Sequence, residues 1–149
     1  PALAAWWRPR LARIAAWVAE EEMARRIRLP NPRLIAAEQA GAWTFAAPAG
    51  PFTLTGRADR IDMLADGTLA LLDYKTGTVP PKAAVERGHA AQLTLEAAMA
   101  AEGGFGAALR GAATQLTYWK LSGGRKRGEA RNAVTPGAES VAAGQEAGR

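Results

Sequence analysis

The chain has 149 residues, enough for one domain with its own core, and its 48% hydrophobic and 22% charged residues are typical of a globular protein. No apolar run approaches the roughly 18 residues that cross a bilayer, and no signal peptide is evident. The chain has no cysteine, which excludes disulfides, cysteine-bound zinc and an iron–sulfur cluster within it, and we expect a soluble, cytoplasmic protein.

The formal net charge of +5 and the pI near 10.2 favour a polyanionic partner. The positive charges form two clusters. One consists of Arg8, Arg10, Arg13, Arg25, Arg26 and Arg28, and the other of Lys120, Arg125, Lys126, Arg127 and Arg131. A nucleic-acid surface and a merely solvated face of a basic protein both remain open on this evidence.

In chain order, the first expected element is an amphipathic helix from about Arg10 to Arg28, because Leu11, Ile14 and Val18 recur at helical spacing. Prolines at 30 and 32 end it. We predict that Trp6, Trp7 and Trp17 lie on or beside its buried face as core residues.

Two short strands are expected at about 34–38 and 43–45, followed by a longer strand from Phe52. In that strand the apolar positions change from even (Phe52, Leu54) to odd (Ile61, Met63). An irregularity between about 56 and 60, with Gly56 as the obvious site, would bring both pairs to one core.

A hairpin with the turn signal Asp66-Gly67 joins this strand to a buried strand over 68–75. A two-residue loop would place Asp59 and Asp73 on opposite faces. A three-residue loop over 65–67 with a left-handed Gly67, or a two-residue turn combined with the irregularity, would place the two carboxylates side by side.

Further along, the sequence predicts a loop over 78–88, a helix from about 90 to 101 and a strand over 114–121. The last residues are mostly Gly, Ala, Glu and Ser with little to bury. We therefore expect one domain over 1–131 and a disordered tail or linker over 132–149.

The candidate metal-binding and catalytic residues are Asp59, Asp73 and Lys75. Two like-charged carboxylates side by side are costly unless a cation neutralises them, which suits a Mg²⁺ site with Asp59, Asp73 and the main-chain carbonyl of Tyr74 as ligands. Lys75 shares a strand face with Asp73 and could orient a water or stabilise developing negative charge. The alternative is an ordinary exposed ion pair on a surface hairpin.

Four strings occur in order: GRADRID (56–62), LLDYKTG (71–77), QLTLEA (92–97) and QLTYWKLSGG (115–124). Together they resemble the RecB-like branch of the PD-(D/E)XK nuclease superfamily, most closely the C-terminal nuclease domain of AddB-type helicase-nuclease subunits. The resemblance covers about 33–124 and implies an α/β, restriction-endonuclease-like core, a mixed central sheet with flanking helices, truncated on its N-terminal side.

The resemblance implies an active centre of Asp59, Asp73 and Lys75, with Gln92 as the Gln of a Gln-x-x-x-Tyr motif in which Glu96 replaces the Tyr. Asp62 is interpreted as structural, because alternation puts it on the other face from Asp59. The upstream Gly-x-x-x-His string of relatives is absent, and Glu38 is the acid that resembles a recurrent Glu before the Gly-x-x-Asp string.

The implied activity is Mg²⁺-dependent hydrolysis of DNA phosphodiesters, with Mn²⁺ as a possible substitute, by an exonuclease domain. The implied setting is a helicase-nuclease complex in double-strand break repair and recombination, with DNA and an AddA-type helicase subunit as partners. If the family's third metal ligand lies outside these residues, the chain alone is expected to be inactive. The rival hypothesis is a non-catalytic nuclease-like module that binds DNA or scaffolds a partner subunit.

Overall fold

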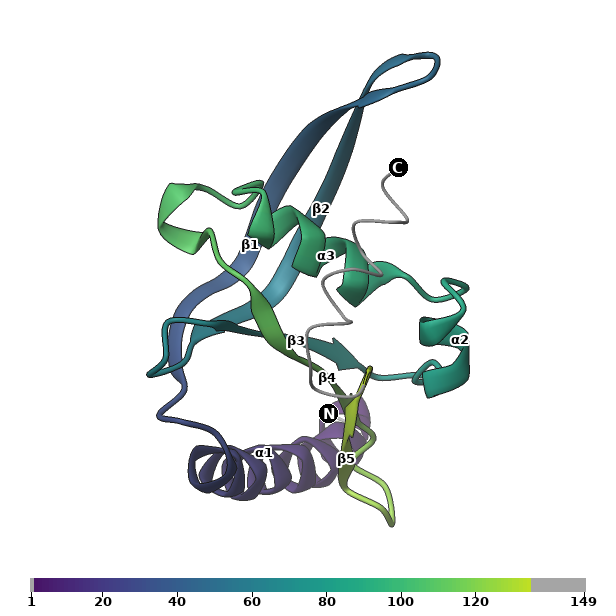
Figure 1. Cartoon of the computed structure of the whole chain (residues 1–149). Helices are drawn as coiled ribbons and strands as arrows, with labels where there is room; N and C mark the ends of the chain where they lie inside the picture. Colours follow the sequence, from purple (N-terminus) through teal and green to yellow (C-terminus); the bar gives the residue numbers. More distant parts are fainter. Residues whose placement is uncertain (1, 135–149) are drawn as a thin grey trace.

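The computed structural model describes residues 2–134, in which a five-stranded sheet lies between helices (Figure 1). The elements are α1 (Ala2–Arg28), β1 (Arg33–Ala47), β2 (Gly50–Met63), β3 (Leu69–Lys75), α2 (Lys82–Glu86), α3 (Gln92–Ala101), the 3₁₀ helix η1 (Ala107–Leu109), β4 (Ala113–Leu121) and β5 (Gly128–Asn132). None of the described helices has the length and apolar character needed to cross a membrane.

The sheet has the order β1-β2-β3-β4-β5 and is mixed, because β3 and β4 pair in parallel while the other neighbours are antiparallel. Parallel neighbours require a crossover, and the segment with α2 and α3 supplies it. The expected α/β, restriction-endonuclease-like architecture is therefore confirmed.

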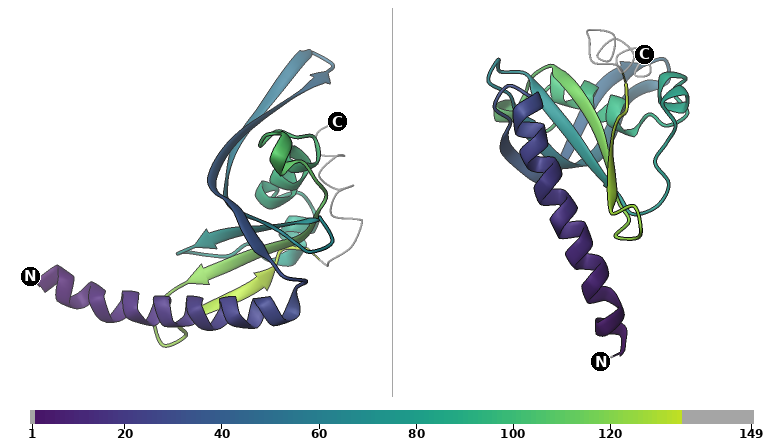
Figure 2. Two further views of the ribbon diagram at one scale, coloured as in Figure 1. Left: turned by 90° about the vertical axis from the view of Figure 1, so that its left-hand side faces the viewer. Right: turned by 90° about the horizontal axis from the view of Figure 1, so that it is seen from below.

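Three layers result, with α1 on one face of the sheet and α3 on the other (Figure 2). The main apolar core lies beneath α3, where Leu93, Ala97 and Ala100 recur on one helix face and are fully buried. Ile61 and Leu71 meet them from the sheet. Three of the seven buried residues of α3 are alanines, whose small side chains let the helix lie close to the strands.

The predicted burial of the first helix is largely wrong. The helix begins at Ala2 and contains Pro9, while Leu11, Met23 and Ile27 are exposed. Its N-terminal half projects beyond the sheet in both views of Figure 2, so apolar residues in that half have no strand to cover them. Met23 and Ile27 belong to the C-terminal half and are 70% and 88% exposed, so they lie outside the face that packs on the sheet.

Of the three tryptophans predicted to be core residues, only Trp17 packs on the sheet. Its ring meets Trp119 edge to face at 5.5 Å between centroids, and Tyr74 meets Trp119 at 6.0 Å. Trp6 and Trp7 are exposed, at 62% and 41%, so their assignment to the core was wrong.

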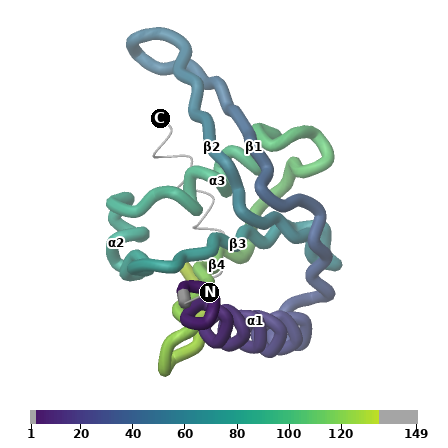
Figure 3. The backbone as a smooth tube through the Cα atoms, turned by 180° about the vertical axis from the view of Figure 1, so that it is seen from behind, coloured from purple at the N-terminus to yellow at the C-terminus, as the bar shows by residue number. Residues whose placement is uncertain are grey.

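The β1–β2 pair is one long hairpin rather than two short strands before a third, and it rises away from α1 (Figure 3). Ala58 and Ile61 both belong to the core, so the apolar positions do change parity between them, as expected. The irregular residue is not Gly56, however. The irregularities lie in β1: Glu38, between the pair of Ala37 with Arg60 and the pair of Gln39 with Ala58, has a left-handed φ of 50°, and the register shift lies between Leu34 and Ala36.

Gly41 lets the middle of β1 pass close to the end of α3. A Cβ built there would lie 2.4 Å from the ring of Phe105 and 2.7 Å from the carbonyl oxygen of Gly104. We expect Gly41→Ala to lower the free energy of unfolding by about 1–3 kcal/mol, because the ring and backbone must shift to admit the methyl group. Urea denaturation measures this, with Gly124→Ala as the control because a Cβ there meets nothing within 4 Å.

Three short elements were missed, namely α2 inside the predicted loop, η1 and β5. β5 is an edge strand with one neighbour, and edge strands are often polar. Its sequence therefore lacks the apolar pattern by which a strand is predicted. Asn132 ends β5 and Ala133 is buried, so these two residues belong to the folded domain rather than to the predicted tail. The rest of the predicted tail, from 135 on, lies outside the described residues.

Candidate active site

The hairpin loop between β2 and β3 has the three-residue form. Gly67 is left-handed, with φ of 82°, and the Leu64 N–H donates to the Thr68 carbonyl at 2.9 Å. The Asp66 carboxylate accepts from the Thr68 N–H at 2.9 Å and from its hydroxyl at 2.7 Å, which holds the turn. In the resulting register Arg60 pairs with Leu72, which sets Asp59 next to Asp73.

Asp59 and Asp73 therefore lie side by side. Oδ2 of Asp59 accepts the backbone N–H of Tyr74 at 2.8 Å, which fixes the carboxylate against β3. Asp73 is buried, whereas Asp59 is partly exposed. Tyr74 directs its ring to the other face, against Trp119. Its proposed carbonyl ligation remains a prediction.

Gln92, the first residue of α3, links the two charged residues of β3. Its amide nitrogen donates to Oδ1 of Asp73 at 2.7 Å, and its amide oxygen accepts from Nζ of Lys75 at 2.9 Å. Because one end of the amide can only donate and the other can only accept, these two bonds determine its orientation. The structure thus brings Asp59, Asp73, Lys75 and Gln92 together.

Glu96 also joins this group, and sequence reasoning did not assign it a function. It is 5% exposed and its Oε1 accepts from the Gln92 amide nitrogen at 3.2 Å, one helical turn away. Its place in the Gln-x-x-x-Tyr pattern was the available signal, since that position faces the site in the helix register. Burial, with the charges of Asp73 and Asp59, raises the pKa of Glu96 to about 7.

The local charge is predominantly negative. Burial and the charge of Asp59 raise the pKa of Asp73, although Lys75 and Gln92 act in the opposite direction. Burial, with the charges of Asp73 and Glu96, likewise raises the pKa of the nearby Tyr118 hydroxyl to about 12. Burial is the largest cause of these shifts and repulsion between the acids adds to it; a bound cation would offset both.

The donor set fits a hard divalent cation. Nζ of Lys75 lies 2.9 Å from Oδ2 of Asp73 as an ion pair, yet without the alignment of a hydrogen bond, so this buried oxygen keeps acceptor capacity. Within residues 2–134, however, no three His, Cys, Asp or Glu side chains form a group able to hold a metal. Two aspartates supply part of a coordination shell, which water and a substrate phosphate commonly complete for Mg²⁺.

Two other acids lie outside the site. Glu38 is exposed and pairs with Arg57 at 3.3 Å. Asp62 faces α1, where it is fully buried between Arg25 and Arg60, so its interpretation as a structural residue is confirmed.

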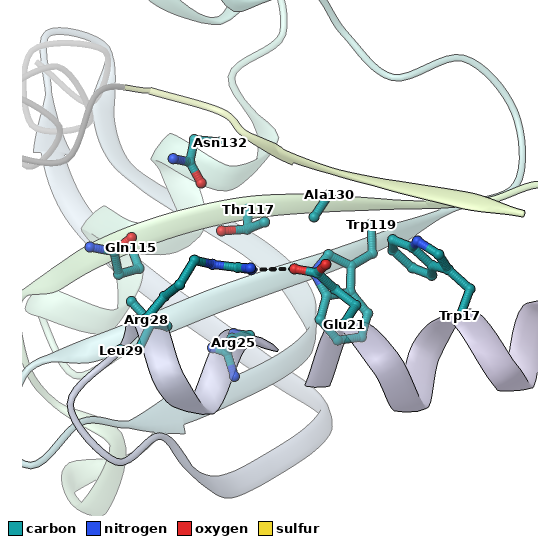
Figure 4. A pocket seen from close by; sticks show the side chains of 10 residues that line it. All are labelled: Trp17, Glu21, Arg25, Arg28, Leu29, Gln115, Thr117, Trp119, Ala130 and Asn132. Atoms are coloured by element: carbon teal, nitrogen blue, oxygen red, sulfur yellow. Dashed lines mark hydrogen bonds and ion pairs between the residues drawn. The ribbon is translucent and has the colours of Figure 1, made fainter. Parts of the chain in front are cut away.

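A cavity of about 530 Å³ lies between α1 and strands β4 and β5, on the opposite face of the sheet from Asp59 and Asp73 (Figure 4). Arg25 and Arg28 line it, but they are already paired with Asp62 and Glu21. The candidate site is assigned to Asp59, Asp73, Lys75 and Gln92 on the other face, because the reactive groups gather there.

Glu96 makes stability depend on pH. The pKa of its carboxyl is about 7 in the folded chain, against 4.5 for an ordinary glutamate, so folding takes up a proton between these values and stability falls as pH rises through them. Glu96→Gln is expected to remove this loss, with the variant gaining on the wild type by about 1.4 kcal/mol per unit of pKa shift. Urea denaturation at pH 5 and pH 8 in EDTA measures the difference; an equal pH dependence in both proteins would contradict it.

Comparison with known proteins agrees with this geometry. The family model described as the PD-(D/E)XK nuclease superfamily matches residues 1–147. Uncharacterized proteins of Rickettsia conorii, Rickettsia bellii and Rickettsia felis are each 44% identical to this chain over 52 residues, or 35% of its length. The matched segment spans 6% of the length of each relative.

Proposed function

The chain belongs to the PD-(D/E)XK nuclease superfamily, and from this premise we propose that it is a Mg²⁺-dependent DNA nuclease domain centred on Asp59, Asp73 and Lys75. Nucleases of this superfamily usually use divalent metals. The observation that carries the proposal is the side-by-side placement of two aspartates with Lys75 ion-paired to one of them at 2.9 Å.

The roles follow from the contacts. Asp59 and Asp73 would hold the metal, which when bound supplies positive charge to a phosphate and lowers the pKa of a water. Tyr74 and Gln92 hold these carboxylates in place through the bonds at 2.8 and 2.7 Å. Lys75, oriented by Gln92, would donate hydrogen bonds to the phosphate oxygens and stabilise the negative charge that develops on them.

The wider setting is also part of the proposal. The GRADRID and LLDYKTG strings support an AddB-type exonuclease domain that acts in the cytoplasm with an AddA-type helicase subunit in double-strand break repair and recombination. Because the curated relatives are far longer than the matched segment, further parts of such a protein would contribute partners and regulation.

The alternative, a non-catalytic module for DNA binding or subunit scaffolding, is weakened by the site itself. A site without metal chemistry has no need for a buried carboxylate with a raised pKa beside a second acid.

Cleavage of end-labelled DNA in Mg²⁺, Mn²⁺ and EDTA tests the proposal. We expect metal-dependent cleavage that Lys75→Gln reduces by about 10²–10³, whereas Lys82→Gln, an exposed lysine on α2, leaves it unchanged. Calorimetric titration with Mg²⁺ measures metal binding directly, so it tests the site even if this chain lacks a third metal ligand and does not cleave DNA. A protein that neither cleaves DNA nor binds Mg²⁺ through Asp59 and Asp73 would contradict the proposal.

A further inference from the structure

The two basic clusters of the sequence meet in space. The turn between β4 and β5, residues 122–127, lies against the middle of α1, where Nε of Arg13 donates to the Gly123 carbonyl at 2.6 Å. Arg127 from the same turn pairs with Glu20 through two bonds, of 2.7 and 3.0 Å. Residues about 110 positions apart in the chain thus lie side by side. Because Arg127 pairs with Glu20 and Lys126 pairs with Glu129 at 2.7 Å, the net positive charge of the surface they form comes from Arg8, Arg10, Arg13 and Arg125.

The N-terminal part of this surface combines cations with exposed aromatic rings. Arg8, Arg10 and Arg13 lie in the first half of α1, and Ala2 to Ala19 contain no acidic residue. The Arg10 guanidinium lies 5.8 Å from the ring centroid of Trp6 and 5.4 Å from that of Trp7. Trp6 is 62% exposed and Trp7 is 41% exposed, although soluble proteins normally cover apolar surface of this kind.

The surface lies at the same end of the molecule as the candidate active site. Lys75 at the carboxyl end of β3 pairs in register with Lys120 on β4, so the two lysines share one face of the sheet. β4 then runs into the turn that rests on α1. The N-terminal half of α1 projects past the carboxyl ends of β3 and β4 in both views of Figure 2.

We propose that Trp6, Trp7, Arg8 and Arg10, with the 122–127 turn, form a binding surface for single-stranded DNA, here called the α1 platform. The inference deepens the proposed nuclease function and rests on it, because the strand bound there would be the substrate. Bases stack on the two tryptophans, and the arginines neutralise neighbouring phosphates. From this platform the strand would pass around the carboxyl ends of β3 and β4 to the α3 face, where Lys120 lies beside Lys75.

Two features favour a single strand over other occupants. Stacking on an exposed indole requires a base that is not already paired and stacked, which duplex DNA does not offer. A protein partner would need to match a helix segment that carries three arginines and no acid, so an apolar helix or a second copy of this cationic chain is poorly suited.

Titration with a fluorescently labelled oligo-dT of about 20 nucleotides in EDTA tests the platform without cleavage. Trp6→Ala/Trp7→Ala is expected to weaken binding by about tenfold per ring. Arg8→Ala should lower the slope of log affinity against log salt by about 0.7. The matched control is Met23→Ala/Ile27→Ala, which removes two exposed apolar residues from the other end of α1 and should leave binding unchanged.

The readouts separate this inference from the nuclease proposal. Asp73→Asn should lose cleavage yet bind oligo-dT at least as tightly as the wild type in EDTA, because it leaves the platform intact and removes a negative charge from the path of the strand. Unchanged oligo-dT binding in the double tryptophan variant would overturn the platform, even if cleavage depends on Asp73. Loss of self-association in that variant, without loss of DNA binding, would assign the surface to a second copy and also overturn it.

Discussion

Asp73→Asn is expected to reduce metal-dependent DNA cleavage by about 10²–10³ or more while the chain stays folded. The carboxylate is 2% exposed and lies beside Asp59, so it supplies negative charge where a cation would bind. Asparagine has nearly the same shape and can still accept the Gln92 amide N–H that now reaches Oδ1 at 2.7 Å. The substitution therefore removes the charge and leaves the packing.

The control for this variant is Asp66→Asn, the same substitution in the exposed turn of the same hairpin. Asparagine there can still accept from the Thr68 N–H, so both cleavage and stability should resemble the wild type. Calorimetry with Mg²⁺ should show weaker binding for Asp73→Asn alone. Wild-type cleavage by Asp73→Asn would remove this residue from the active centre.

Asp62→Ala is expected to lower the free energy of unfolding by about 3–5 kcal/mol, the largest stability effect that we predict. Asp62 is fully buried between β2 and α1 and accepts from Arg25 and, at 2.8 and 2.9 Å, from Arg60. Arg60 also binds Glu22 at 3.0 and 3.1 Å. Loss of the central carboxylate leaves two cations facing each other in a place that water cannot readily reach.

Urea denaturation measures this effect as a lower midpoint with an unchanged slope. Glu38→Ala is the matched control, because it removes an acid from an exposed ion pair with Arg57 and should cost less than about 1 kcal/mol. A cost for Asp62→Ala as small as that of the control would show that the buried network does not hold α1 on the sheet. The double variant Arg25→Met/Asp62→Leu should recover much of the loss, since no unpaired charge from this pair remains.

These two aspartates illustrate how the two faces of the sheet differ. Asp62 is surrounded by cations that satisfy it, whereas Asp73 shares its surroundings with Asp59 and Glu96 and has one lysine beside it. Full internal pairing is typical of a structural residue. A buried carboxylate that lies beside a second acid and is not fully paired is the feature that points to chemistry.

The sequence by itself determined that a hairpin joins β2 to β3, because Asp66-Gly67 is a local turn signal, and it identified Asp59, Asp73 and Lys75 as candidate residues. It left the loop length open; the structure has the three-residue form with a left-handed Gly67, and this length sets the register that places Asp59 beside Asp73. α3 was also predictable, because an Ala-rich run that ends in Gly103 carries its helical signal locally. Such features depend on interactions between near neighbours in the chain, which the residue order specifies directly.

Only the tertiary structure decided which face of α1 is buried, that Glu96 lies under the active centre, and that Arg13 meets Gly123. The apolar period of α1 suggested a core face, but burial depends on whether a strand lies opposite, and the sheet ends before the helix does. The raised pKa of Glu96 arises from surroundings that other strands and helices provide. These properties come from contacts between distant segments, and no local pattern encodes them.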